Sequence, residues 1–398
     1  MTVALPAEPS NVIVLDIGTV CCRAGIGGQS LPTVTIPYNT RFLLEGAAAY
    51  DFSLYLQQDH QIFIDYKEEG SYERLRRLLK RLLFELFFRH LAVDPRRKRI
   101  LFVENPFTPV FFKQALVEIL FRVFDISSVS FVLSHVAGLH AFGKVSGLVV
   151  ECGYKETTII PIYDGRPCLF YVEIVSVGGA MLDEAVWRFL LSGESCVVLN
   201  RNGQSIPFNE LGEEFTSNRF LVAQMKRKFC SFTPNSCNSH IDSQGFARIA
   251  YKNGLVVSFC LAEFHQQVTC ALLRKDDEER SIATAICDSI YKSQRDLRPL
   301  LAANIMFIGG CAGIPDFCRM ISSQVQLELE KTPKFAAFRA LNRSLEVHSN
   351  AFPPECTAWS GGSLMAPMRL ASEYSQQDWQ RGEKVPDWSC HSFTAEME

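Results

Sequence analysis

The sequence predicts an α/β protein made of two lobes. Its 398 residues exceed the size at which one hydrophobic core usually stops growing. In the first half, short β-branched strands alternate with helices that have one apolar face, which is typical of an α/β architecture. A strand–turn–strand pattern with an acidic residue two positions before a glycine occurs once in each half. The two lobes are therefore expected to share a local structure.

Composition and charge exclude several classes of protein. Hydrophobic residues make up 47% of the chain and charged residues 21%, as in a packed protein. The formal net charge of -3 predicts no nucleic-acid partner and no attraction to an anionic membrane. Residues 1–10 lack the basic region of a signal peptide, and no apolar run is long enough to span a bilayer, so a cytoplasmic protein without direct membrane insertion is expected. The 14 cysteines lack zinc-site spacing and are expected to be reduced and mostly buried.

Two predicted hairpins have an acid and a glycine at their tips, and a later strand ends in two glycines. The strands are expected at residues 11–15, 21–26, 147–150, 157–163 and 304–308. The turns that follow them include Asp16-Ile17-Gly18-Thr19, Glu151-Cys152-Gly153, Asp164-Gly165 and Gly309-Gly310. Such elements suit a phosphate clamp between two lobes, because glycines let backbone N–H groups approach phosphate and acids hold a hydrated Mg²⁺. A single glycine turn is more often structural punctuation.

A helix with apolar residues at helical spacing is predicted between the two hairpins. The apolar positions are Leu75, Leu78, Leu79, Leu82, Leu83, Leu86 and Phe87. Ser71 stands where an N-cap is expected, and the outer face is basic, with Arg74, Arg76, Arg77, Lys80 and Arg81. A basic amphipathic helix can lie on a membrane, but one followed by Asp94-Pro95 and a strand is more often a core helix packed on a sheet.

The remaining elements are less regular toward the end of the chain. Strands are expected at residues 100–103 and 128–133, and helices at residues 111–124 and 134–143. Residues 202–214 and 231–245 are expected to be polar loops, residues 274–280 to open a solvated helix, and residues 359–363 to open the final helix before a polar tail at residues 372–398.

The order of these motifs resembles the actin family over nearly the whole chain. The matching segments are Asp16-Ile17-Gly18-Thr19, Arg23-Ala24-Gly25-Ile26-Gly27-Gly28, Pro161-Ile162-Tyr163-Asp164-Gly165, Gly309-Gly310 with Pro315, and Trp359 with Gly361-Gly362-Ser363. The resemblance implies a two-lobed actin-like fold, shared with sugar kinases and chaperone ATPases, with a nucleotide cleft between the lobes. It lapses over residues 38–70 and the two polar loops.

The resemblance divides the chain into four subdomains and implies a set of nucleotide contacts. Subdomain 1 would comprise residues 1–37, 71–141 and 357–398, a reduced subdomain 2 residues 38–70, subdomain 3 residues 142–181 and 278–356, and subdomain 4 residues 182–277. The implied contacts are Asp16, Gly18, Thr19, Arg23, Gly153, Lys226, Gly309 and Gly310. Asp16 would also hold Mg²⁺ through water.

Departures from the actin pattern argue against ATP hydrolysis. Ser134 stands where actin has the Gln that positions the attacking water, and Thr158 where it has a nearby His; neither is a good water organiser. Further replacements, all at positions that line the actin nucleotide, are Val20 for Gly, Glu151 for Asp, Tyr154-Lys155 for Asp-Gly, Arg227 for Glu, Cys311 for Thr and Gly313 for Met. The expected cofactor is ATP or ADP with Mg²⁺, bound without hydrolysis, or no nucleotide at all.

Two local segments resemble the actin-related subunits of the dynactin pointed-end complex: residues 152–156 and residues 385–388. This implies a non-catalytic subunit of the cytoplasm and cytoskeleton that caps the pointed end of the actin-related filament. Its partners would be filament subunits, other pointed-end dynactin subunits and, indirectly, dynein and cargo adaptors in retrograde microtubule-based transport.

Two other functions are considered. One is a nucleotide-dependent switch or ATPase of the same superfamily, against which Ser134, Tyr154 and Lys155 count. The other is an actin-related subunit of a chromatin remodeller, which the lack of a basic tract disfavours. The capping prediction itself depends on residues 38–70, which are shorter than and unrelated to the actin segment that reaches a filament neighbour, while residues 351–359 still resemble the family.

Overall fold

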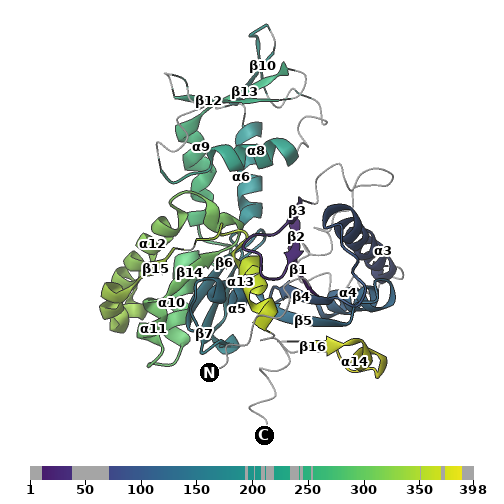
Figure 1. The fold of residues 1–398 in the computed structure, drawn as a ribbon. Helices are drawn as coiled ribbons and strands as arrows, with labels where there is room; N and C mark the ends of the chain where they lie inside the picture. The colour runs from purple at the N-terminus through teal and green to yellow at the C-terminus, as the bar shows by residue number, and fades with distance from the viewer. Residues whose placement is uncertain are drawn as a thin grey trace.

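The fold was analysed in a computed structural model of the chain. The structure describes residues 11–37, 71–192, 196–200, 202–207, 211, 219–233, 242, 245–251, 254–349, 351–368 and 373–387. The predictions for residues 1–10 and 38–70, for the side chain of Ser71 and for Trp388 lie outside these residues. Within them the chain forms two mixed sheets side by side, with helices around them and a smaller sheet above (Figure 1).

The first large sheet has the order β16-β5-β4-β1-β2-β3. Its strands are β1 (Val12–Ile17), β2 (Cys21–Ile26), β3 (Val34–Pro37), β4 (Arg99–Glu104), β5 (Ser128–Leu133) and β16 (Glu373–Ser375). The second has the order β15-β14-β6-β7-β8, with β9 also paired to β7. Its strands are β6 (Gly147–Cys152), β7 (Thr157–Tyr163), β8 (Arg166–Pro167), β9 (Glu173–Val175), β14 (Ile305–Ile308) and β15 (Val347–His348).

The two large sheets repeat one connection pattern. In the first, β1 is antiparallel to β2 and parallel to β4, which is parallel to β5. In the second, β6 is antiparallel to β7 and parallel to β14, which is parallel to β15. The repeat predicted from the two acid-glycine hairpins is therefore a repeat of topology. Parallel central strands covered on both faces must be apolar throughout, as β1, β4 and β14 largely are.

A smaller antiparallel sheet, of order β11-β10-β13-β12, lies above the second large sheet (Figure 1). Its strands are β10 (Cys196–Leu199), β11 (Ser205–Pro207), β12 (Phe246–Ala250) and β13 (Val256–Cys260). The helices α6 (Gly179–Leu191), α8 (Arg219–Phe229) and α9 (Leu261–Gln267) connect it to the rest of the second half. Phe189, Phe229 and Phe259 form edge-on aromatic contacts that join sheet and helices.

Helices cover both large sheets (Figure 1). They are α3 (Ser71–Phe84) continued by a π-helical turn η3 (Glu85–His90), α4 (Val110–Arg122), α5 (Ser134–Ala141), α10 (Ile282–Lys292), α11 (Arg298–Ala302), α12 (Phe317–Lys331), α13 (Thr357–Met365) and α14 (Gln376–Gln380), with short 3₁₀ helices at η4 (Leu169–Tyr171), η8 (Thr269–Leu273), η9 (Gly310–Gly313), η10 (Pro333–Ser344) and η11 (Ala366–Met368). The apolar residues of α3 are buried against α4, which confirms the core-helix interpretation.

Two sequence predictions in the second half are wrong. Residues 274–280 do not open a helix, because the Asp276 carboxylate accepts the N–H groups of Glu278 and Arg280 at 3.0 and 2.9 Å and closes a turn. Helix α10 begins after it, where Ser281 and Thr284 form a capping box. The helix at residues 359–363 is not the last one, since β16 and α14 follow it.

The tail is structured because aromatic side chains anchor it. Tyr374 of β16 is buried, and the rings of Tyr374 and Trp379 lie 6.2 and 5.9 Å from that of Phe121 on α4. β16 pairs with the edge strand β5, with Tyr374 opposite Val129. Periodicity over a three-residue strand is too short to reveal such an element in the sequence.

A buried lysine on α4 joins the end of the described chain to the first sheet. Lys113, 1% exposed, pairs with Glu104 of β4 at 3.2 Å and with Asp387 at 3.5 Å. Its ammonium also donates to the carbonyl of Pro386 at 2.9 Å. Burying a charge is costly unless it is paired, so these contacts give the Val385-Pro386-Asp387 segment a structural role in this lobe.

Helices α5 and α13 cross between the two large sheets at very short range. A Cβ on Gly361 would lie 1.7 Å from the carbonyl oxygen of Ala137, and one on Gly362 would lie 2.6 Å from Val103. Next to them, the fully buried Trp359 donates its indole N–H to the carbonyl of Val14 at 3.1 Å. Glycine is therefore required at Gly361 by backbone contact with another helix.

Gly361→Ala is expected to destabilise the protein by about 1–3 kcal/mol, because the two helix backbones must separate to admit a methyl group. Thermal unfolding of the purified protein measures this change. Gly310→Ala is the matched control, since no atom lies within 4 Å of the position that its new methyl group would take. Equal melting temperatures for the two variants would contradict the proposed role of the crossing.

Candidate functional site

The first hairpin brings Asp16 and Arg23 together across β1 and β2. The two residues are opposite each other in the strand register, and Arg23 Nη1 donates to Asp16 Oδ2 at 3.0 Å. Burial raises the pKa of the Asp16 carboxyl, Arg23 counteracts this increase, and nearby Glu151 adds to it. The carboxylate predicted to hold hydrated Mg²⁺ thus already has the Arg23 guanidinium as its counter-cation.

The second hairpin holds its acid in a buried polar network. Ser134, the first residue of α5, donates its hydroxyl to Glu151 Oε2 at 2.6 Å. His135 Nδ1 lies 3.4 Å from the same oxygen, and His135 Nε2 lies 2.9 Å from Thr158 Oγ1. Burial raises the pKa of Glu151 and lowers that of His135 to about 4, so the imidazole is neutral near pH 7.

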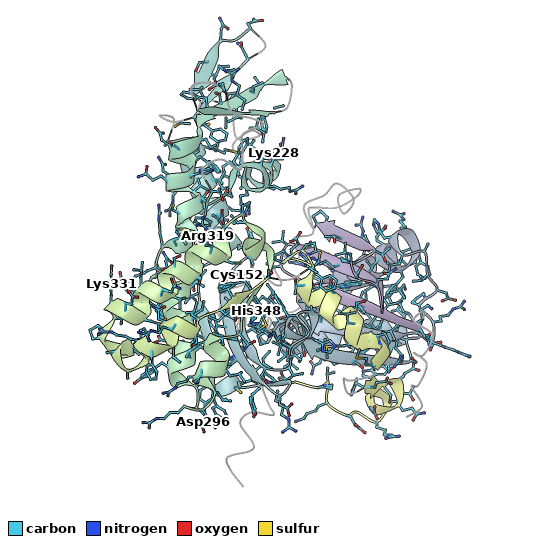
Figure 2. All side chains as sticks on the ribbon, turned by 60° about the vertical axis from the view of Figure 1, so that its left-hand side comes forward. Cys152, Lys228, Asp296, Arg319, Lys331 and His348 are labelled. Atoms are coloured by element: carbon cyan, nitrogen blue, oxygen red, sulfur yellow. The ribbon has the colours of Figure 1, made fainter. Side chains whose placement is uncertain are left out.

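Tyr154, at the tip of the second hairpin, interacts with two residues of the neighbouring helices. Its hydroxyl donates to Asp183 Oδ2 on α6 at 2.8 Å. Lys226 of α8 forms an ion pair with the same carboxylate, and its ammonium lies 5.7 Å from the centroid of the Tyr154 ring. We call Tyr154, Asp183 and Lys226 the Tyr154 cluster. Figure 2 shows Cys152, two residues before Tyr154, near the middle of the molecule, and Lys228 of α8 higher up.

The predicted glycine contacts differ in what they do. Gly309 has φ of 92°, and a Cβ there would lie 2.4 Å from the carbonyl oxygen of Cys152, so backbone packing alone requires glycine. The N–H groups of Gly18 and Gly153 donate to the carbonyls of Cys21 and Glu156 within their own turns, both at 3.0 Å. Around Gly310 there is open space, as a phosphate-approaching glycine needs.

The predicted residues therefore form two groups. Asp16, Gly18, Thr19 and Arg23 lie on the first hairpin, and Gly153, Gly309 and Gly310 lie at the ends of β6 and β14, which are parallel neighbours. Glu151 raises the pKa of Asp16 and Arg23 lowers that of Glu151, so the two groups lie within electrostatic reach of each other. Lys226 belongs to the Tyr154 cluster instead. Their assignment to a nucleotide stays a prediction.

Sequence reasoning missed Asp183, Gly178-Gly179 and His135. A Cβ on Gly178 would lie 2.6 Å from the carbonyl oxygen of Tyr154, so the start of α6 abuts the second hairpin tip. The N–H groups of Gly179 and Ala180 donate to the carbonyls of Gly153 and Tyr154 at 3.1 and 2.7 Å. The Gly-Gly pair just before an amphipathic helix was the available signal; Asp183 offered none.

The described residues fit Mg²⁺–nucleotide only in part. The first hairpin retains Thr19 and the acid-base pair Asp16–Arg23, which suit phosphate and metal. On the other side, Asp183 already neutralises Lys226, and the Tyr154 ring lies beneath its ammonium. A nucleotide using Lys226 would have to break a partly buried ion pair. We therefore derive no hydrolytic step through this site.

The duplicated sheets, the α5–α13 crossing between them and the hairpin tips at their junction define the class of two-lobed actin-like folds. The family model described as Actin matches residues 7–202 and 213–380. The chain belongs to the actin family, which confirms both the fold and the family resemblance predicted from the motifs.

Curated relatives support the same conclusion. The chain is 23% identical to actin-related protein 10 of Dictyostelium discoideum over 90% of its own length and 83% of that protein. It is 23% identical to actin-like protein 9 of Bos taurus over 94% and 90% of the two chains, and 22% identical to actin-like protein 7A of Macaca fascicularis over 91% and 79%.

Membrane and metal sites were also considered in the described part of the chain. None of its helices has the length and apolar character needed to cross a bilayer. The described residues include no group of three or more histidine, cysteine, aspartate or glutamate side chains arranged to hold a metal ion. The 12 described cysteines are free thiols, of which six are buried and six partly exposed, and burial raises the pKa of several, such as Cys196 to about 12.

The low pKa of His135 makes a pH-dependent contribution to stability. As the pH falls below the ordinary histidine pKa of about 6.5, the unfolded chain binds a proton that folded His135 accepts only near pH 4, so stability is lost over this window. The loss is about 1.4 kcal/mol for each unit of lowering. His135→Gln is expected to flatten the fall in melting temperature between pH 6.5 and pH 4 relative to the parent protein.

Glu151 and Asp16 act in the opposite direction as the pH falls, because burial raises the pKa of both carboxyls. The melting temperature of the variant must therefore be compared with that of the parent protein at each pH. His140→Gln is the control, since His140 lies near the end of the same helix, α5, and is only half-buried. A parallel pH dependence for His135→Gln and the parent would refute the role given to His135.

Proposed function

We propose that the chain is a non-catalytic actin-related subunit of dynactin, placed at the pointed end of its actin-related filament. The support is membership of the actin family, similarity to a protein named actin-related protein 10, and the sequence segments at residues 152–156 and 385–388. Through other pointed-end subunits the protein would serve dynein-driven transport along microtubules.

The observation that supports a non-catalytic role best is the Tyr154 cluster together with the bond between Ser134 and Glu151. Water-positioning groups must be free to orient a nucleophile near the reacting phosphate. The Ser134 hydroxyl is committed to Glu151, and Thr158 is committed to His135. These contacts connect the start of α5 directly to the second hairpin. Protein side chains therefore make a connection between the lobes that a bound ligand would otherwise make.

Capping follows from an asymmetry between two surfaces. Head-to-tail assembly uses a different surface at each end of a subunit, so a subunit with one competent surface joins an end and stops growth. Residues 351–355, at the end that still resembles the family, are exposed at Ala351, Pro353 and Glu355. The opposite surface would depend on residues 38–70, which lie outside the described residues.

ATP hydrolysis is expected to be absent. Single-turnover assays with labelled ATP, run on the purified protein with and without filament ends, should show no phosphate release above background, because the Ser134 and Thr158 hydroxyls are buried and hydrogen-bonded to protein groups. Mass analysis of nucleotide released on denaturation tells whether ATP, ADP or neither is bound. Phosphate release at rates like those of actin on polymerisation would favour the switch or ATPase alternative.

Binding to a filament end is expected to require the exposed residues near Glu355. Electron microscopy of the assembled complex should place the protein at the pointed end with a filament subunit on one side only. Glu355→Arg is expected to weaken incorporation by roughly tenfold without changing the melting temperature, as for a charge at the centre of an interface. Glu184→Arg, on the exposed face of α6, is the matched control.

A position with filament subunits on both sides would defeat the capping proposal. Copurification with chromatin-remodelling subunits and without dynactin subunits would defeat the dynactin assignment itself. The two results are distinguishable. A position between two filament subunits can be seen only in an assembled dynactin filament, whereas copurification without dynactin subunits means that no such filament is present.

A further inference from the structure

A line of exposed cationic and aromatic side chains follows the outer face of α3 and η3. It comprises Arg74, Arg77, Lys80, Phe84 and Phe88, all exposed, and we call it the α3 stripe. At about 100° per residue these positions fall within one third of the helix circumference. The leucines on the opposite face are buried against α4, so among the described residues the stripe is the face of this helix turned away from the core.

The two phenylalanines of the stripe are about half-exposed. Phe84 and Phe88 expose 50% and 46% of their surfaces, and their rings lie 4.8 Å apart. Neighbouring Val123, at the end of α4, exposes 45%. Isolated apolar residues are normal on a surface, but a contiguous group of this kind marks a site of interaction.

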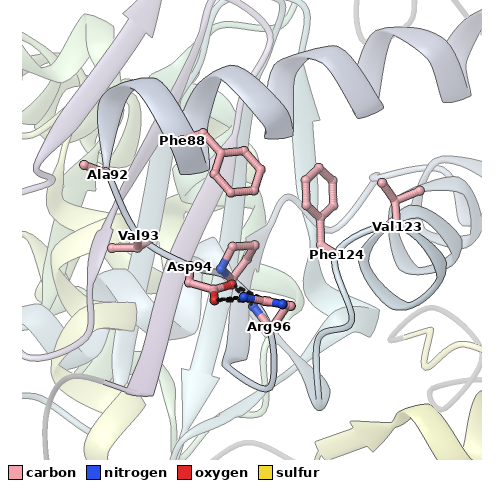
Figure 3. A pocket seen from close by; sticks show the side chains of 8 residues that line it. Phe88, Ala92, Val93, Asp94, Arg96, Val123 and Phe124 are labelled. Atoms are coloured by element: carbon pink, nitrogen blue, oxygen red, sulfur yellow. Dashed lines mark hydrogen bonds and ion pairs between the residues drawn. The ribbon is translucent and has the colours of Figure 1, made fainter.

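A groove continues the stripe at its C-terminal end (Figure 3). Its volume is about 550 Å³, and its walls are Phe88, Ala92, Val93, Asp94, Pro95, Arg96, Val123 and Phe124. The rings of Phe88 and Phe124 lie 6.4 Å apart on one side. On the other side Arg96 and Asp94 form a two-point ion pair, with Nη2 2.7 Å from Oδ2, that fixes the polar rim. A bulky apolar side chain fits such a groove.

The cations of the stripe are available to a partner. Arg76 and Arg89, which flank the stripe, are paired with Glu73, Glu118 and Glu85. In the part of the chain that the structure describes, Arg74, Arg77 and Lys80 make no ion pair. A local excess of positive charge on a chain of net charge -3 attracts acidic partners to this face in particular.

We propose that the α3 stripe and its groove bind an acidic segment of a partner protein that carries an aromatic or aliphatic anchor. The anchor enters the groove between the Phe88–Phe124 ring pair and the Arg96–Asp94 ion pair, and carboxylates lie along the cations of the stripe. From Arg74 to Phe88 the stripe is about 21 Å long, which corresponds to about four turns of a bound helix. This interaction goes beyond the proposed capping function, because it uses a side face of the first lobe and not a filament surface.

A peptide suits this surface better than a membrane does. The groove is concave and accepts a single bulky group, whereas a lipid surface is contacted by convex, protruding side chains. Insertion of α3 into lipid would also require its leucines, which are buried against α4. A second copy of the chain is the remaining occupant, and it is distinguished by the oligomeric state.

The test uses the full-length protein and a fluorescein-labelled helical peptide of Glu and Ala with a central Trp-Leu anchor. Fluorescence anisotropy should give a Kd on the order of 10 µM that weakens with added salt. Phe88→Ser and the double variant Arg77→Glu, Lys80→Glu should each weaken binding by about tenfold or more, as for anchor and charge positions of an interface. A peptide with Lys in place of Glu should not bind.

Matched controls are Tyr163→Ser, an exposed aromatic residue of β7, and Arg295→Glu, an exposed cation of the second half. Both should bind the peptide as the parent does, and all variants should keep the parent melting temperature. The proposal fails if the peptide does not bind, or if stripe and control variants bind it equally. It also fails if phosphatidylserine-containing vesicles bind and the peptide does not, or if Phe88→Ser converts a dimer of the parent protein into a monomer.

Discussion

The short contact between α5 and α13 is the constraint on which the arrangement of the two sheets depends. Gly361 lets the two backbones meet, and Trp359 on the same helix fills the space beside β1 and donates a hydrogen bond to it. α5 follows β5 directly in the chain and precedes β6, so its position fixes where the chain passes from the first sheet to the second. With a larger separation, Ser134 at the start of α5 could not reach Glu151 of the second hairpin.

Two ion pairs, Asp16–Arg23 and Asp183–Lys226, lie at that junction. Arg23 compensates Asp16, and Lys226 compensates Asp183, while the neutral His135 fills a buried polar position beside Glu151. In an enzyme of this fold, we would expect the same polar groups to bind a ligand that is converted during the reaction. Here Ser134 bonds to Glu151 and Tyr154 to Asp183, while the buried Arg23 Nε has no hydrogen-bond partner among the described residues.

Much of the fold follows from local signals in the sequence. The paired hairpins, the helix with leucines from Leu75 to Leu86 and the strand before Gly309 have regular periodicity or glycine punctuation, and the structure places them where the sequence predicts. The tail elements β16 and α14 were missed because three to five residues carry no period. Residues 274–280 were misassigned because charge density resembles a solvated helix, while one carboxylate, Asp276, decides the turn.

The candidate site was predictable only for residues within a motif. Asp16 and Arg23 belong to a hairpin whose register the sequence suggests. Asp183 could not be identified, since its role arises from the packing of α6 against a distant hairpin tip. The Tyr154 and Lys155 replacements were visible in the sequence, but which neighbours Tyr154 contacts depends on tertiary structure alone.

The first lobe is assembled from both ends of the chain, and this determines when it can be completed. Lys113 depends on Pro386 and Asp387, β16 completes the sheet edge at β5, and α13 seats Trp359 against β1. A ribosome delivers these last segments only after the whole second half has emerged. Until then Lys113 has Glu104 but not Pro386 or Asp387, and the space beside β1 that Trp359 fills is open, so the first lobe cannot be completed.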